Sequence, residues 1–389
     1  MNENPFKLGL LDLPESPDLG IRNLSGVFRH TTNSYKFYWF LAILEAVKND
    51  YQQISFDLLT AEMLAQIWFP VHYFKLDFGQ TDQLSALARE LQYSTDLAIN
   101  AEREEVRDAA LALCLKNKRF KKSFSDKQRY VPTRFLMPWF QSDLKGLNDY
   151  LRDRLIISLA NESFKTSETS LYKFIQTEHL KGIEISDPWM NYLKKNFRIV
   201  RAFVLWHLLT WMQARNPHVP NLPEKLFPPQ SRDLKIARKY WDLALTQKYE
   251  WHCPYSDQRI IVKNYSLDHF LPWSFVCHDQ IWNLIPIPKS VNSSKSDALP
   301  DLNTYLPAFV GLQYQALKIN LNQKTTSKAI EDYTDLFHCS VDTLKTLTFF
   351  DFEAKLKETI QPLEQIAANM GFQRHWIYLN HDLNTKFDK

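Results

Sequence analysis

The sequence predicts a mainly α-helical protein that carries one small α+β module in its C-terminal half. Glycine is scarce, with 8 residues in 389, which favours helices over folds that need many tight turns. Apolar residues recur at helical spacing along much of the chain, and strand-like segments are expected only within 260–288. The hydrophobic fraction is 45%, and the chain has 26 Phe, 17 Tyr and 11 Trp, enough to fill large cores.

Hydrophobic periodicity predicts helices in the first half of the chain. We expect a buried helix over 33–50 and a second helix over 56–68. The stretch 82–118 is expected to form one long helix, or two helices that are broken near Asn100. The first 30 residues are expected to be irregular because three prolines interrupt them.

The clearest helical pattern spans 186–217. Ser186 or Asp187 can cap this helix, and Pro188 suits its first turn. Its buried side is expected to consist of Trp189, Leu193, Val200, Val204, Leu208 and Trp211.

Five prolines within 217–230 predict a semi-rigid linker between two domains. We expect a helical N-terminal domain over 1–230 and a C-terminal domain over 231–389, whose core lies at 250–300. Helices over 231–247, 341–347 and 350–368 are expected to flank that core. The N-terminal domain carries no motif that indicates a particular chemistry.

The chain is mildly basic, with a net charge of +3, and a denser run of Lys and Arg occupies 116–134. Three aromatic residues lie among these cations: Phe120, Phe124 and Tyr130. Cations on phosphates and rings on bases would make this run a nucleic-acid contact surface. Its candidate contacts are Lys121, Lys122 and Arg129. The alternative is a solvated loop whose cations complement the dipole of the preceding helix.

The four cysteines form no CxxC pair, so we expect no disulfide framework and a reducing compartment. The N-terminus lacks the basic start and apolar block of a signal peptide. The longest apolar run, 37–44, is far too short to cross a membrane. We therefore expect a cytoplasmic protein without a membrane partner, and the sequence sets no oligomeric state.

A group of polar residues lies within the strand-like stretch. We expect a first strand over 260–270 that ends with Asp268 and His269, and a returning strand over 282–288 that begins at Asn283. The helix that follows carries Asn292. His269 and Asn283 are 14 positions apart, and Asn283 and Asn292 are 9 apart. Each residue alone is common at strand ends, turns or caps, so the indication of a functional site comes from their combination.

This combination resembles the HNH endonucleases, which have the ββα-metal fold, and in particular the nuclease module of the RNA-guided Cas9 enzymes. The features that match are Asp268, His269, Asn283, Asn292, the sequence Lys295-Ser296-Asp297, Pro272 and the pair Ser274-Phe275. The third letter of the family name is a histidine in many members, and Asn292 takes its place here. The resemblance covers 250–300 only, and an RNA-guided role is not carried over.

The resemblance implies hydrolysis of DNA phosphodiester bonds that leaves a 5′-phosphate and a 3′-hydroxyl. His269 suits the general base, because an imidazole with a pKa of about 6.5 can accept a proton at neutral pH. Asp268 and Asn292 would hold one Mg²⁺ ion, with Mn²⁺ as a substitute. Asn283 is expected to bond the intervening loop and so to position His269. The candidate phosphate contacts are Lys295 and Lys289.

A structural zinc ion is the second metal to consider, because some family members hold one with two CxxC-type pairs. Here His252 and Cys253 are adjacent, as are Cys277 and His278, and adjacent residues cannot easily share one tetrahedral ion. We therefore expect no structural zinc, with both cysteines acting as small buried apolar residues.

Two other functions stay open. The chain could be a nuclease that acts on RNA, or a subunit of a multi-protein complex whose nuclease is silent until assembly. The resemblance also points to a bacterial antiviral defence or mobile-element system, beside a partner subunit such as an ATPase. This chain has no P-loop, so a nucleotide-driven step would need another subunit.

Overall fold

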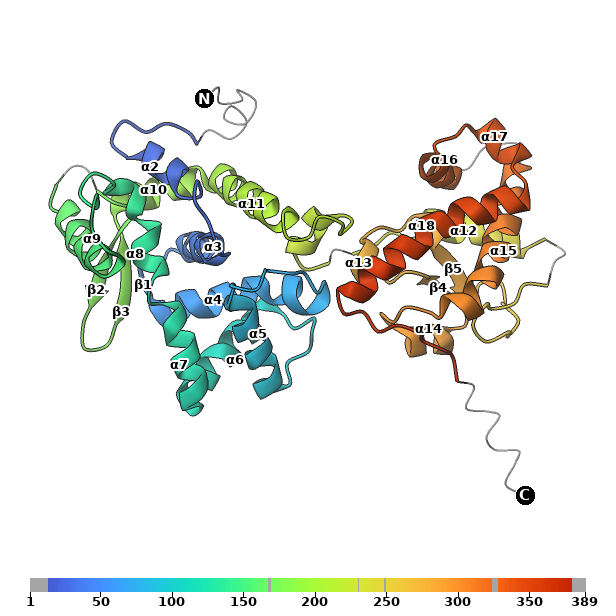
Figure 1. Ribbon diagram of the computed structural model, residues 1–389, viewed down its shortest axis with the longest axis horizontal. Coiled ribbons are helices and arrows are strands. Elements are labelled where there is room, and N and C mark those ends of the chain that lie inside the picture. Colours follow the sequence, from blue (N-terminus) through green and yellow to red (C-terminus); the bar gives the residue numbers. More distant parts are fainter. Residues whose placement is uncertain (1–12, 167–168, 230, 248–249, 324–327, 380–389) are drawn as a thin grey trace, which may run out of the picture. The chain divides into compact units, whose positions relative to one another are not determined.

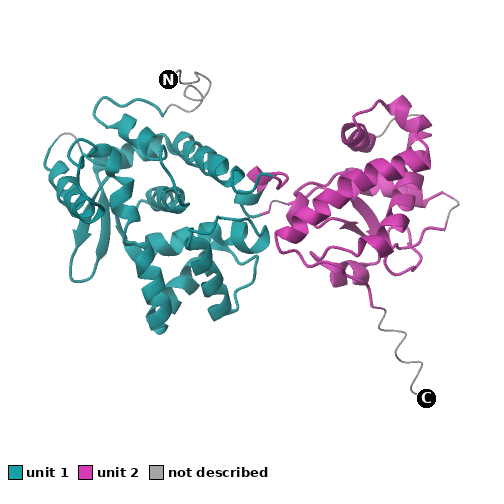
Figure 2. Ribbon diagram, viewed as in Figure 1, with its two compact units in different colours: residues 1–217, 225–228 teal, residues 218–224, 229–389 magenta. Residues whose placement is uncertain are grey.

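The computed structural model describes residues 13–166, 169–229, 231–247, 250–323 and 328–379. The chain divides into two compact units (Figure 2): unit 1 comprises 1–217 and 225–228, and unit 2 comprises 218–224 and 229–389. The proline-rich stretch contributes to both units, and the expected boundary residue, Gln230, lies outside the described residues. Helices dominate each unit (Figure 1), so the prediction of a mainly α protein with a small α+β module is confirmed.

A buried helix organises unit 1. α3 (Tyr35–Lys48) is apolar on all sides, and every residue from Phe37 to Leu44 is buried. A helix of this kind must be covered all round. The helices that pack against it (Figure 1) are α4 (Phe56–Trp68), α8 (Val131–Phe135), α10 (Asp187–Lys195) and α11 (Phe197–Gln213).

The rest of unit 1 consists of short helices and turns. The helices are α2 (Ile21–Gly26), α5 (Leu84–Thr95), α6 (Arg103–Lys116), α7 (Lys118–Lys127) and α9 (Asp149–Ser163). A π-helical turn, η1 (Phe69–Tyr73), extends α4. The 3-10 turns are η2 (Met137–Trp139) and η3 (Leu222–Leu226), and η3 falls in the stretch that the two units share.

Two helical expectations differ from the structure, and for a third the structure agrees with one of the two alternatives. α2 lies within the stretch that was expected to be irregular. The stretch 82–118 forms two main helices, α5 and α6, as the second alternative predicted. The pattern over 186–217 also forms two helices, because Asn196 adopts φ −105° and ψ 18° between α10 and α11. The predicted buried side of these two helices is nevertheless confirmed residue by residue.

Unit 1 also contains an antiparallel sheet that the sequence analysis missed. Its strands are β1 (Gln53–Ser55), β2 (Tyr172–Gln176) and β3 (Lys181–Ile185), in the order β1–β3–β2. Gly182 lies in the central strand, and a Cβ atom there would be 2.0 Å from the carbonyl oxygen of Ile54. The close approach of β1 to β3 therefore requires glycine at this position.

The α+β module of unit 2 begins with a β-hairpin. β4 (Ser266–His269) pairs antiparallel with β5 (Leu284–Ile287), which places Asp268 opposite Ile285 and His269 opposite Leu284. The connection and the following segment contain α13 (Trp273–Val276), the 3-10 turn η4 (Ile281–Asn283) and α14 (Lys289–Lys295). This is the expected order, but the first strand is shorter than predicted, because Ile261 and Asn264 close a turn instead.

Longer helices enclose the hairpin and share its apolar core. They are α12 (Lys235–Leu245), α15 (Leu302–Leu321) and α18 (Phe349–Asn369), and the smaller elements are η5 (Lys328–Ile330), α16 (Glu331–Phe337) and α17 (Val341–Thr346). Across the described ranges, no helix has both the length and the apolar character needed to cross a lipid bilayer.

One buried amide from α15 holds the backbone where β5 begins. The side-chain nitrogen of Gln313 lies 3.1 Å from the carbonyl oxygens of both Ile281 and Trp282, and 2.9 Å from that of Leu284. The hydroxyl of Tyr333 donates to the amide oxygen of Gln313 at 2.6 Å. Gln313 is fully buried, so its amide bonds these carbonyls in a place that water cannot reach, and the carbonyl of Ile281 also accepts from the backbone N–H of Leu284.

We expect Gln313→Ala to lower the free energy of unfolding by about 2–4 kcal/mol, because buried carbonyls lose their donor. Urea unfolding at neutral pH measures this loss. Gln323→Ala is the matched control, since Gln323 lies just beyond the end of α15, is exposed, and donates from its side chain to the carbonyl of Ile319. Equal destabilisation by the two substitutions would contradict the role given to Gln313.

Candidate active site

The predicted site residues of the hairpin are buried in unit 2. Asp268 and His269 end β4 and, as neighbours on a strand, project to opposite sides of it. Only 4% of Asp268 and 6% of His269 is exposed. Two polar groups at such depth need partners, and each is held by a different set of side chains.

Asn283 ties the loop of the hairpin to the end of β4. Its amide oxygen accepts from the backbone N–H of Leu271 at 2.8 Å, and its amide nitrogen donates to the carbonyl of the same residue at 2.9 Å. The backbone N–H of Phe270 donates to the carbonyl of Asn283 at 2.8 Å. Asn283 is fully buried. It therefore fixes the backbone of Phe270 and Leu271, which come directly after His269, as expected from the sequence.

His269 is paired with an acidic residue from the same loop. Its Nε2 atom lies 2.8 Å from Oδ1 of Asp279, which follows α13. Arg232 lies 3.8 Å from the same carboxylate oxygen, and its guanidinium lies 5.2 Å from the centroid of the Trp273 ring. The carboxylate of Asp279 thus sits between the imidazole and a cation.

The surroundings favour the neutral form of the His269 imidazole. Burial lowers its pKa below the ordinary value of 6.5, and the hydrogen bond and negative charge of Asp279 oppose this by raising the pKa. The imidazole is therefore neutral at pH 7. When Nε2–H donates to Asp279, the lone pair of Nδ1 is free to accept a proton.

Asp268 is held by a lysine and a tyrosine. The ammonium of Lys295 lies 3.1 Å from Oδ1 of Asp268 and donates to the carbonyl of His269 at 2.7 Å. The hydroxyl of Tyr255 donates to Oδ2 of Asp268 at 3.0 Å. Lys295 is 1% exposed. The charge of Lys295 is therefore directed inward and matched by Asp268, and its predicted contact with phosphate stays a prediction.

The donors around Asp268 fit a hard divalent cation. Asn292 is half-buried on α14, three positions before Lys295, so both side chains lie on the side of the helix from which Lys295 reaches Asp268. A carboxylate offers about four lone-pair positions, and Lys295 and Tyr255 occupy two of them. The remaining positions and the amide oxygen of Asn292 are the kind of ligand that Mg²⁺ takes.

The other predicted nucleic-acid contacts are exposed side chains. Lys289 opens α14 in unit 2, and the remaining three lie in unit 1: Lys121 and Lys122 on α7, and Arg129 just beyond it. Two of the three aromatic residues of this run are buried, contrary to the expectation that they contact bases. Phe120 is 0% exposed and Phe124 is 1% exposed, so both are core residues that cannot stack on bases.

The cysteines near the site, Cys253 and Cys277, form no disulfide, and both are buried. Among the described residues, no three His, Cys, Asp or Glu side chains are grouped so that they could hold a metal ion. A cation site made of one Asp and one Asn does not contain three such side chains. The finding therefore concerns zinc-type clusters and does not bear on a cation held by Asp268 and Asn292.

Two residues of the site were missed by reasoning from the sequence. Asp279 is the one acidic residue between His269 and Asn283, which was a usable signal for a partner of the histidine. Tyr255 had no comparable signal, because its contact with Asp268 depends on how the segment before β4 folds back.

Comparison with protein families matches residues 253–301 to the HNH endonucleases. The matched segment contains β4, β5 and α14, and it confirms the resemblance inferred for 250–300. The match identifies an HNH endonuclease module in this part of the chain and supports nuclease activity in general, which implies a nucleic-acid substrate. HNH nucleases generally use divalent metal ions. Searches of curated proteins and of solved structures gave no match.

We expect Asn283→Ala to lower the free energy of unfolding by about 2–4 kcal/mol, because both hydrogen bonds to Leu271 are lost in a buried place. Chemical unfolding measures the loss. Asn303→Ala is the control, since Asn303 is exposed on α15. An unchanged unfolding midpoint for Asn283→Ala would show that the loop is held by other contacts.

Asp279→Asn is expected to lower the pKa of His269 further, because it removes the negative charge that stabilises the imidazolium. NMR titration of the His269 ring in metal-free protein measures the shift. Asp257→Asn is the matched control. Asp257 is exposed, and its backbone φ of 54° suits Asn as well as Asp. A higher pKa in Asp279→Asn would contradict the pairing.

Proposed function

We propose that this protein is a metal-dependent endonuclease that hydrolyses DNA phosphodiester bonds, with His269 as the general base. The observation that carries the proposal is the imidazole of His269 at the end of β4, which is held by Asp279 at 2.8 Å and is adjacent in sequence to the carboxylate of Asp268. The family match over 253–301 supports the reaction class.

His269 would take a proton from a water molecule as the water oxygen attacks phosphorus. The bond from phosphorus to the 3′-oxygen breaks, and that oxygen is protonated from solvent, which leaves the 5′-phosphate and 3′-hydroxyl ends. Asp279 does not touch the reacting atoms in this scheme. It acts as a positioning residue that holds the ring and the position of its proton.

Asp268 and Asn292 would hold Mg²⁺, which when bound supplies Lewis-acid stabilisation of the charge on the phosphate. Lys295 keeps Asp268 in place from the protein side. The exposed cations Lys289, Lys121, Lys122 and Arg129 are proposed contacts to the phosphates of the substrate, where they would add affinity rather than chemistry.

A second candidate is a nuclease that stays silent until a partner subunit joins it, and the burial of His269 favours it. The side chain of His269 is 7% exposed, and Asp279 occupies its Nε2 atom. The two candidates predict opposite results for Asp279→Asn. A positioning role lowers the cleavage rate by about tenfold or more, whereas release of a silent state raises it.

For the biological setting we propose a bacterial defence or mobile-element system. The proposal rests on the resemblance to HNH endonucleases, and unit 1, a compact body with its own core, is the part proposed to recognise a target or a partner. A nucleotide-driven step would come from a partner such as an ATPase.

His269→Ala is expected to lower the rate of plasmid cleavage in Mg²⁺ by about 10³-fold while DNA binding is retained, because only the proton acceptor is lost. Cleavage followed on gels and binding followed by fluorescence anisotropy measure the two effects. His252→Ala is the matched control, since His252 lies in the same module but is exposed.

Wild-type rates in His269→Ala would overturn the assignment of the base. The same assay on RNA and on single-stranded DNA tests the choice of substrate. Faster cleavage of RNA than of DNA by the wild type would replace DNA with RNA in the proposal and leave the assignment of His269 intact.

A further inference from the structure

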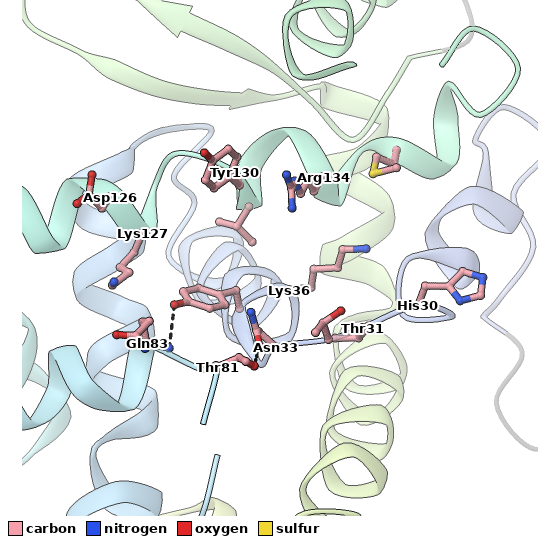
Figure 3. Close-up of a pocket in the computed structure, with 14 residues that line it drawn as sticks. His30, Thr31, Asn33, Lys36, Thr81, Gln83, Asp126, Lys127, Tyr130 and Arg134 are labelled. Carbon is pink, nitrogen blue, oxygen red and sulfur yellow. Dashed lines mark hydrogen bonds between the residues drawn. The ribbon is translucent and has the colours of Figure 1, made fainter. Parts of the chain in front are cut away.

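A pocket in unit 1 lies where the end of α7 and the start of α8 face the beginning of α3. Its volume is about 460 Å³, and it shares no residue with the candidate active site. Figure 3 shows Tyr130 and Arg134 on one side, Asn33, Thr81 and Gln83 on the opposite side, and Lys36 between them. The α7–α8 wall belongs to the basic run 116–134, and none of its lining residues is among the phosphate contacts proposed for the nuclease.

Positive charge in this pocket exceeds negative charge. Lys36, Lys127 and Arg134 line it, and Asp126 is the acidic side chain among the lining residues. Arg134 is paired with Asp149 at 2.9 Å. Within the described ranges, no carboxylate forms an ion pair with Lys36 or Lys127.

Lys36 is the most informative of these cations. Its ammonium donates to the carbonyl of Val27 at 3.1 Å, which satisfies a hydrogen bond but does not neutralise the charge. Burial, and then the neighbouring Arg134 cation, lower the pKa of Lys36. Two like charges in a half-buried site disfavour each other, and an anion between them would relieve this.

The rest of the lining suits a ligand that is larger than an inorganic anion. The polar groups are Thr31, Thr32, Asn33, Thr81 and Gln83, which can bond hydroxyls or base edges. Two guanidinium groups lie close to the partly exposed ring of Tyr130, that of Arg129 at 5.0 Å and that of Arg134 at 4.6 Å from its centroid. A ring and guanidinium planes fixed in this way are a surface on which a base can stack.

We propose that this pocket binds a nucleoside phosphate, with the phosphate between Lys36, Lys127 and Arg134 and the nucleoside against Tyr130 and the polar wall. The volume is within the range of small-molecule sites and far exceeds the needs of a phosphate ion. The ligand is either a free nucleotide or the terminal nucleotide of a nucleic-acid strand. The function of the HNH module does not depend on this site, and the site does not depend on that function.

Isothermal titration calorimetry on the full chain, with divalent metal chelated, tests the proposal. The probes are adenosine 5′-monophosphate, inorganic phosphate, and a short single-stranded oligonucleotide with and without a 5′-phosphate. The wild type is expected to bind the nucleotide or the phosphorylated strand more tightly than inorganic phosphate. Lys36→Met and Lys127→Glu should each weaken that binding by about tenfold or more.

Lys118→Glu is the matched control, because it makes the same charge change as Lys127→Glu on α7 but is exposed and lies outside the pocket. It should leave binding of the mononucleotide unchanged. Thermal melting shows whether each variant is folded. If Lys36→Met is unfolded, the result for Lys127→Glu decides, since the side chain of Lys127 is only half-buried and its substitution is compatible with folding.

Tight binding of the mononucleotide assigns the site to a free nucleotide, and a preference for the 5′-phosphorylated strand assigns it to a strand end. The proposal is overturned if the wild type binds neither probe, if inorganic phosphate binds as tightly as both, or if Lys127→Glu binds like the wild type.

Discussion

The two hydrogen bonds between the side chain of Asn283 and the backbone of Leu271 hold the site together. They join the start of β5 to the residues that follow β4, and so close the loop that carries Asp279. With that closure, the carboxylate of Asp279 reaches Nε2 of His269. Gln313 supports the same point from α15, by bonding carbonyls on both sides of Asn283. The geometry of the imidazole therefore depends on buried amides that take no part in the chemistry.

Local patterns made the helices and the hairpin predictable. The apolar run of α3 and the buried side of α10 and α11 follow from spacing alone. The sheet of unit 1 was missed because β1 pairs with β3, a strand more than a hundred residues further along the chain, and a three-residue strand has no periodicity of its own. Long-range pairing of this kind is decided by tertiary packing.

Within the site, residue types were predictable but side-chain directions were not. Asn283 makes the loop contacts that the resemblance implied, and Asp268 and His269 end the strand as expected. Lys295 was expected to contact phosphate, and in the structure its ammonium is directed at Asp268, because the face of α14 that contacts β4 decides where the ammonium points. Asp279 was visible as an acid in the loop, but only the closed loop identifies its partner.

The ammonium of Lys295 changes what unit 2 requires in order to fold. Small zinc modules collapse only when the ion arrives, since their ligands repel one another until then. Here the chain carries its own counter-cation for Asp268, deep in the core and bonded also to the carbonyl of His269. Packing of this module therefore needs no bound cation to balance the buried carboxylate of Asp268, because the chain supplies that charge itself.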